Sequence, residues 1–145
     1  SNGEEFHALQ KCLLEGNVFQ LLVPLMHKLP SVAGTGSTQV SAPYDIFIDS
    51  NQNIYVADFN NQRVQQWQSG QTNGSTIAGV TSQSGNGFNQ FNSPTSVFVD
   101  LNDNLYVADR DNYRIQRWAP NSVIGVTVAG GKKQVLSLLV YCLSE

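Results

Sequence analysis

The chain has 145 residues, a formal net charge of −3 and only 13% charged residues, a length that corresponds to about one domain. The negative net charge excludes a general electrostatic attraction to phosphate backbones or anionic membranes. Two Cys and two His are too few for a RING-type zinc cluster, which holds two zinc ions and needs four ligands per metal. Asn and Gln together supply 27 of the 145 residues. Because Asn stabilises tight turns, this composition favours a turn-rich β protein.

An internal repeat dominates the sequence. Residues 43–79 align with residues 94–130 at a constant offset of 51 and without a gap, and 17 of the 37 aligned positions are identical. Five further positions exchange one aliphatic residue for another. Because a fixed period indicates a repeat architecture, the two segments are predicted to share one structure.

Each copy contains four short runs separated by turn residues. In the first copy these runs are residues 46–48, 54–57, 63–67 and 76–78. The continuous apolar run at residues 46–48 predicts a strand buried on both faces, and the Asx-rich residues 49–53 predict a tight turn after it. Period two then places Arg63, Gln65 and Trp67 on one face of the third run. Four strands in a period of this length are typical of a β-propeller blade, so the predicted fold is all-β.

The segments outside the two copies have a different character. Residues 1–30 are predicted to be a helical or irregular N-terminal segment, because residues 4–15 carry apolar residues at helical spacing and Pro24 interrupts the next run. Residues 31–131 are assigned to two blades. Within them, residues 31–42 are interpreted as a remnant strand of a preceding blade, since Val32-Ala33-Gly34 resembles the end of each copy. Residues 132–145 are an apolar C-terminal tail.

The combined motif resembles the NHL repeat. The second copy carries it as Pro94, Val97, Val99, Asp100, residues 104–109, Asn112, residues 114–116, Trp118 and residues 127–130. The first copy is nearly as similar. The resemblance implies blades of a closed, usually six-bladed propeller. Its family includes secreted or periplasmic domains, bacterial sensor parts, a peptide-amidating lyase and the substrate-recognition ends of tripartite-motif ubiquitin ligases.

Two blades cannot close a propeller, because the smallest propellers have about four. We therefore expect the chain to be a fragment of a longer propeller, since its flanks do not resemble blades. The alternatives are a homotrimer, in which three copies supply six blades, and capping of the open faces by the terminal segments.

Polar and aromatic residues that recur in both copies are interpreted as structural. An Asp, an Asn and an Arg surround the second turn of each copy, and their repetition favours an Arg–Asp pair and an Asn-capped turn over a unique catalytic site. The Trp of each third run is predicted to pack between blades. These structural residues are Asp58, Asn61, Arg63, Trp67, Asp109, Asn112, Arg114 and Trp118. Asx turns likewise explain Asp49 and Asp100, so no catalytic residue, metal ligand or cofactor is predicted.

Binding is expected where the two copies differ, because the residues they share form the scaffold. The differing positions lie at the start of the first strand and between the second and third strands, and a propeller presents both sets on one face. The predicted binding residues are Tyr44, Phe59, Asn60, Gln62, Arg110, Asp111 and Tyr113. Aromatic side chains in loops offer contact area at low entropic cost, so a protein or peptide is the expected partner.

Two other partner classes are not expected. Arg110, Arg114 and Arg117 form a basic cluster beside Tyr113 and Trp118, and some NHL-repeat proteins bind single-stranded RNA. The first copy does not continue this charged stripe, so RNA binding is not predicted. A membrane partner is not predicted either.

The predicted function is a non-catalytic NHL-type scaffold that binds protein or peptide. One alternative is the substrate-recognition part of a tripartite-motif-like ubiquitin ligase. Another is a propeller lyase or hydrolase with a metal in its central channel. Asn73-Gly74-Ser75 matches the glycosylation sequon and, equally, a turn, which leaves the cellular compartment open.

Overall fold

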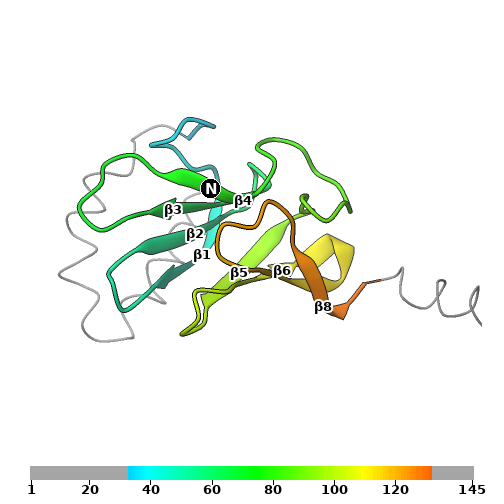
Figure 1. Cartoon of the computed structure of the whole chain (residues 1–145). Coiled ribbons are helices and arrows are strands. Elements are labelled where there is room, and N and C mark those ends of the chain that lie inside the picture. Colours follow the sequence, from blue (N-terminus) through cyan, green and yellow to red (C-terminus); the bar gives the residue numbers. More distant parts are fainter. Residues whose placement is uncertain (1–32, 132–145) are drawn as a thin grey trace, which may run out of the picture.

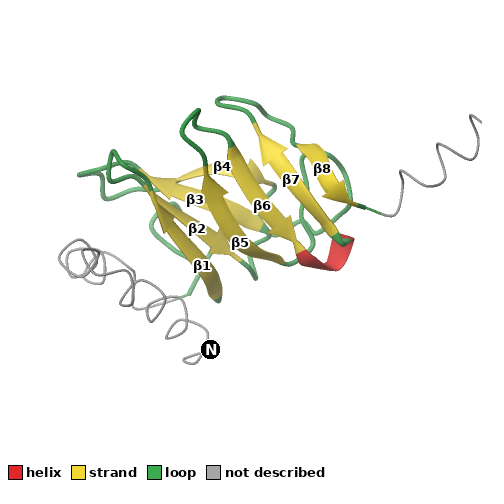
Figure 2. Ribbon diagram, turned by 90° about the horizontal axis from the view of Figure 1, so that it is seen from below, coloured by secondary structure: helices red, strands yellow, loops and turns green. Residues whose placement is uncertain are grey.

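The computed structural model describes residues 33–131 and shows two antiparallel four-stranded sheets in sequence order (Figure 1). The first sheet, blade 1, contains β1 (Pro43–Ile48), β2 (Ile54–Asp58), β3 (Arg63–Trp67) and β4 (Ser75–Gly79). The second sheet, blade 2, contains β5 (Pro94–Val99), β6 (Leu105–Asp109), β7 (Arg114–Trp118) and β8 (Val126–Gly130). A single turn of 3-10 helix, η1 (Arg110–Asn112), joins β6 to β7. Figure 2 shows the sheets side by side, with β1 of one next to β5 of the other.

The first turn of each blade forms around one aspartate. The carboxylate of Asp49 accepts hydrogen bonds from the backbone N–H groups of Asn51 and Asn53, and the Asp100 carboxylate does the same for Asn102 and Asn104. Each turn also places one residue at positive φ, Gln52 in blade 1 and Asp103 in blade 2. The Asx-rich sequence of these turns therefore closes each hairpin by local side-chain bonding.

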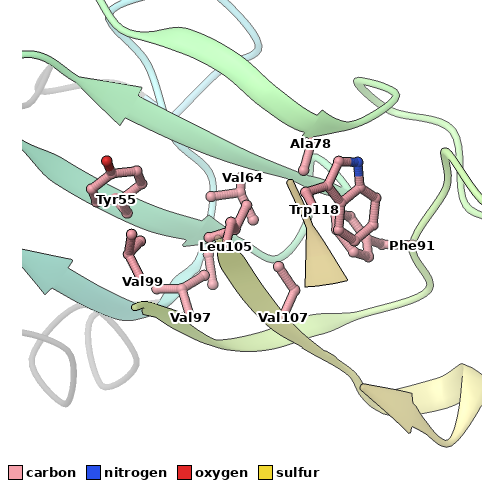
Figure 3. Close-up of a cluster of buried hydrophobic side chains, with 10 residues drawn as sticks. Tyr55, Val64, Ala78, Phe91, Val97, Val99, Leu105, Val107 and Trp118 are labelled. Atoms are coloured by element: carbon pink, nitrogen blue, oxygen red, sulfur yellow. The ribbon is translucent and has the colours of Figure 1, made fainter. Parts of the chain in front are cut away.

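Each blade has two faces, because successive side chains in a strand point to opposite sides. We call the face of blade 1 that contacts blade 2 its downstream face. The face of blade 2 that contacts blade 1 is its upstream face. Each blade has both faces, and equivalent residues of the two repeats are assigned to the face of the same name. The downstream face of blade 1 presents Phe47, Tyr55, Ala57, Val64, Ile77 and Ala78. The upstream face of blade 2 presents Phe91, Val97, Val99, Leu105, Val107 and Trp118. Together they form the main hydrophobic core (Figure 3).

A polar contact fixes the two blades in register at the inner strands. The carboxylate of Asp45 on β1 is buried and accepts hydrogen bonds from Ser96 Oγ at 2.7 Å and from the backbone N–H of Val97 at 3.1 Å, both on β5. The strand β5 also runs close to β1, β2 and β3. The core and this polar contact therefore hold blade 2 against blade 1.

The structure corrects two sequence expectations about strands. The run Ile46, Phe47 and Ile48 is half-buried rather than buried on both faces. Ile46 and Ile48 stay partly exposed because the described part of the chain places a second blade only on the downstream side. Residues 33–42 form turns and no strand, so the remnant strand expected over residues 31–42 is not supported across its described part. They instead form the loop that leads into β1, in the place that residues 84–93 take before β5.

Other expectations fall outside the described residues. These are the helical or irregular segment at residues 1–30 and the apolar tail at residues 132–145. Across residues 33–131, no helix is long and apolar enough to cross a membrane.

Candidate recognition surface

A buried ion pair organises the β2–β3 turn of each blade. In blade 1, Arg63 Nε donates to Asp58 Oδ2 at 2.7 Å, and both side chains are almost completely buried. Asn61 Nδ2 donates to the same carboxylate oxygen at 2.8 Å, and the backbone N–H of Ser41 donates to the other at 2.7 Å. Burial raises the pKa of the Asp58 carboxyl, whereas these three donors favour its ionised form.

The rest of the guanidinium binds the loop before the blade. Arg63 donates to the backbone carbonyls of Thr35, Gly36 and Gln39 at 2.8–3.1 Å, and Asn61 donates to that of Gly34 at 2.8 Å. This network connects the β2–β3 turn to residues about 25 positions earlier. The incoming loop is therefore fixed by buried, charge-assisted hydrogen bonds.

Blade 2 repeats this network with the same offset of 51. Arg114 Nε donates to Asp109 Oδ2 at 2.7 Å, and its terminal nitrogens donate to the carbonyls of Asn86, Gly87 and Gln90. Asn112 donates to the carbonyl of Gly85 at 2.8 Å. The structural repeat thus begins at Gly34 and Gly85, nine residues before the sequence repeat first noted. The pattern Gly-x-Gly-x-x-Gln shared by residues 34–39 and 85–90 is the sequence signal that could have revealed this.

On this scaffold, three of the predicted binding residues form a continuous row across the boundary between the blades. The rings of Tyr44 and Phe59 are stacked with centroids 5.4 Å apart. The guanidinium carbon of Arg110, from blade 2, lies 5.1 Å from the centroid of the Phe59 ring. Tyr44 is the second residue of β1 and Phe59 follows β2, so the pairing of these strands places both rings at the same end of blade 1. We call Tyr44, Phe59, Arg110 and the adjacent Asp111 the boundary row.

The fourth member of the boundary row is positioned by two hydrogen-bond partners. Asp111 accepts from Arg110 Nε at 2.9 Å and from Ser93 Oγ at 2.7 Å. Both bonds lower the pKa of the Asp111 carboxyl, and the bond from Arg110 has the larger effect. The ion pair remains about half exposed, so both charges are accessible to a partner.

Two further predicted residues contribute to the support of the row. Asn60 is exposed and donates through Nδ2 to Ser41 Oγ at 3.2 Å. Gln62 accepts through Oε1 from the backbone N–H of Ser93 at 2.8 Å, which connects the second turn of blade 1 to the entry of blade 2. Both amides thus bind loop residues beside the boundary row.

Tyr113 occupies a different environment. It ends η1 in the left-handed conformation, with φ of 55°, and its side chain is 67% exposed. With Arg110, Ile115 and Gly130 it lines a shallow hollow of about 300 Å³ on the downstream side of blade 2. The structure therefore divides the seven predicted binding residues between the boundary row, its supports and this hollow.

Sequence reasoning did not identify a groove of about 640 Å³ at the opposite end of the strands. Its lining includes Asp49, Tyr55, Gln66 and Asp103, together with residues of β4 and of the β7–β8 loop. The Tyr55 hydroxyl donates to Asp49 at 3.1 Å and accepts from Gln66 at 2.9 Å, and burial raises its pKa to about 12. Asp49 and Tyr55 recur in the second repeat as Asp100 and Tyr106, and this repetition was the sequence feature that could have pointed to the groove. Their roles in a turn and in the core did not indicate a groove between the blades.

Two other candidate sites can be placed. Asn73 is exposed in the loop between β3 and β4, so the sequon stays a prediction at an accessible position. Within residues 33–131, no three His, Cys, Asp or Glu side chains are grouped so that they could hold a metal ion.

Comparison with known proteins identifies the repeats. The family model of the NHL repeat matches residues 43–67 and 91–118, which contain the first three strands of each blade. No curated protein sequence matches the chain significantly. The second match begins at Phe91, inside the loop that the Arg114 network fixes. The chain therefore carries two NHL repeats.

Proposed function

We propose that this protein is a non-catalytic propeller-type scaffold that binds a protein or peptide through the boundary row. The observation that carries the proposal is that residues differing between the two repeats meet across the blade boundary. Tyr44 and Phe59 supply stacked aromatic surface and Arg110 supplies an adjacent cation. Aromatic and Arg side chains are the types that dominate binding energy at protein interfaces.

The scaffold beneath the row supports this function. The Asp58–Arg63 and Asp109–Arg114 networks fix the loops on either side of the row through buried hydrogen bonds. A surface held in place before binding loses less conformational entropy when a partner docks. We propose that the eight recurring Asp, Asn, Arg and Trp residues serve this structural role and do not contact the partner.

The chemistry of the row indicates the character of the partner. The Phe59 ring contacts both the Tyr44 ring and the Arg110 guanidinium. A peptide with an aromatic or aliphatic side chain next to a carboxylate would contact both the rings and the cation. We therefore propose that the two blades form part of a larger propeller that recognises such peptides.

A peptide-display selection on the whole chain tests this proposal. Peptides enriched on the wild type should lose affinity by about tenfold or more for Phe59→Ala and for Arg110→Ala, as expected for interface residues of large energetic effect. The matched control is Phe88→Ala, which removes a 61% exposed Phe from the loop between the blades and should leave affinity unchanged.

The control also defines the contrary result. The boundary row is not the recognition surface if Phe88→Ala weakens binding as much as Phe59→Ala does. The same holds if the enriched peptides bind Phe59→Ala and Arg110→Ala with the affinity of the wild type. Circular dichroism of each variant separates loss of binding from loss of folding.

A further inference from the structure

The downstream face of blade 2 is an exposed copy of a buried surface. Val64 on the downstream face of blade 1 is fully buried, whereas its equivalent in blade 2, Ile115, is 36% exposed. Phe47 packs against the core, but its equivalent Phe98 is 53% exposed. The same change affects Val128, which is 46% exposed and replaces Ile77. Positions that bind a neighbouring blade in the first repeat therefore present the same apolar chemistry to solvent in the second.

The upstream face of blade 1 offers the chemistry that this surface fits. In blade 2, the upstream face covers blade 1 with aliphatic and aromatic residues from β5, β6 and the loop before them. The equivalent residues in blade 1 are Val40, Ile46, Ile48, Ile54 and Val56. Val40 and Val56 are buried within blade 1, whereas Ile46, Ile48 and Ile54 are only half-buried. These three isoleucines form the part of the face that a second copy can cover.

The polar contacts at the blade boundary are also reciprocal between the two repeats. Asp45 binds Ser96 across the boundary, and these two residues occupy equivalent positions, 51 residues apart. Phe59 contacts Arg110 across the same boundary, and this pair is equivalent as well. When blade 2 is followed by a blade 1, Ser96 comes opposite Asp45 and Arg110 comes opposite Phe59. The same residue types meet at every boundary of an alternating array.

We propose that the downstream face of blade 2 binds the upstream face of blade 1 in a second copy of this chain. The contact is head-to-tail, because two different faces meet, and a head-to-tail contact forms a ring when its rotation closes. Three copies give the six blades that NHL-type propellers usually have. This proposal specifies how the larger propeller of the proposed function is completed.

The molecular mass of the intact chain in solution tests the proposal directly. Sedimentation equilibrium should give three times the chain mass of 15.9 kDa. Ile115→Asp and Val128→Asp should each give a monomer, because each buries a carboxylate in the apolar interface. The control Leu101→Asp places the same charge at a 99% exposed position of the β5–β6 turn and should remain trimeric. A monomeric wild type, or a trimer that survives both face variants, overturns the proposal.

A mixing experiment then tests the direction of the contact. Ile115→Asp blocks the downstream face and Ile48→Asp blocks the upstream face, so each variant alone should be a monomer. Mixed, they retain one intact pair of faces and should form a one-to-one dimer. If the mixture stays monomeric while both variants are folded by circular dichroism, the contact is not head-to-tail and the proposal fails.

These variants leave the boundary row intact, so the two proposals can fail separately. Ring formation is read from mass with substitutions at Ile115, Val128 and Ile48, whereas recognition is read from peptide affinity with substitutions at Phe59 and Arg110. A trimer that binds no peptide contradicts only the proposed function, and a monomer that binds peptide contradicts only the ring.

Discussion

Two Arg–Asp pairs in successive blades have opposite physical roles. Arg63 and Asp58 have side-chain exposures of 3% and 0%, whereas Arg110 and Asp111 have exposures of 50% and 43%. A buried carboxylate that loses its cation keeps the cost of its desolvation. An exposed carboxylate that loses its cation is solvated by water and screened by salt, so the loss costs little free energy. The first pair therefore determines stability, and the second remains available for binding.

Substituting these arginines should separate the two roles. Arg63→Ala should lower the free energy of unfolding by about 3–5 kcal/mol, because it leaves Asp58 buried without its cation. The matched control Arg110→Ala should lower it by less than about 1 kcal/mol. Urea denaturation measures both values, and equal losses for the two variants would contradict this assignment.

At the scale of the element, the β5–β6 turn depends on the ionised form of one side chain. Asp100 accepts hydrogen bonds from the backbone N–H groups of Asn102 and Asn104, from Asn104 Nδ2 and from the Tyr106 hydroxyl. The side-chain bond from Asn104 is the largest of the effects that lower the pKa of the Asp100 carboxyl. A carboxyl with a lowered pKa in the folded state stabilises that state above its unfolded pKa of about 3.9.

The turn should therefore weaken in acid. Its contribution is complete above about pH 5 and is lost as the pH falls through the lowered pKa of Asp100. Asp100→Asn should reduce the difference in melting temperature between neutral and acidic solution. The control Asp103→Asn removes a carboxyl of the same turn that lies outside this set of hydrogen bonds. An identical pH dependence in Asp100→Asn and the wild type would rule out this role of the turn.

The end of β4 shows how a close contact adds to backbone strain. Gly79 has φ of +86°, and a Cβ there would meet the carbonyl oxygen of Gln62 and lie 2.8 Å from the Phe91 ring. Gly70 has a similar φ of +79° but nothing within 4 Å of its Cβ position. The two glycines therefore differ in steric surroundings and share a backbone conformation.

Alanine at each glycine should distinguish strain from collision. Gly70→Ala should cost about 1–2 kcal/mol from the left-handed conformation alone. Gly79→Ala should cost about 1–3 kcal/mol more, because the new methyl group overpacks the boundary between the blades. Thermal unfolding of the two variants gives the difference, and equal costs would show that the contact at Gly79 relaxes.

At the scale of the whole molecule, the two blades share one core. Phe91 belongs to blade 2 but is fully buried beside Val64 and Ala78 of blade 1, and its ring lies 4.7 Å from that of Trp118. Each blade also carries one Trp. We expect the blades to unfold together, because separating them exposes the largest apolar cluster of the described residues.

Single-Trp variants test this cooperativity. In Trp118→Phe the fluorescence reports blade 1 through Trp67, and in Trp67→Phe it reports blade 2. Each transition should coincide with the far-ultraviolet circular dichroism of the same variant. Adding Phe91→Ala should lower the free energy of unfolding by about 3–5 kcal/mol in both backgrounds. Two separate transitions would mean that the blades unfold independently.

Much of the fold was predictable from local sequence. The repeat at offset 51, the Asx turns after Asp49 and Asp100 and the four strands of each blade all follow from short-range patterns. The family-model match confirms that the two copies are NHL repeats. The strand limits were too short at β1, which starts at Pro43. The loop at residues 34–42 was misinterpreted, because its carbonyls are bound by Arg63, a residue far away in sequence.

The sequence by itself determined the unit of structure, because turn chemistry and strand alternation act over a few residues. It also indicated which loops differ between the repeats. Only the tertiary structure decided that Tyr44, Phe59 and Arg110 form one row, since the row depends on how blade 2 docks against blade 1. The same docking buries Val64 and leaves Ile115 exposed, a difference between equivalent residues that depends on the neighbouring surface and not on their local sequence.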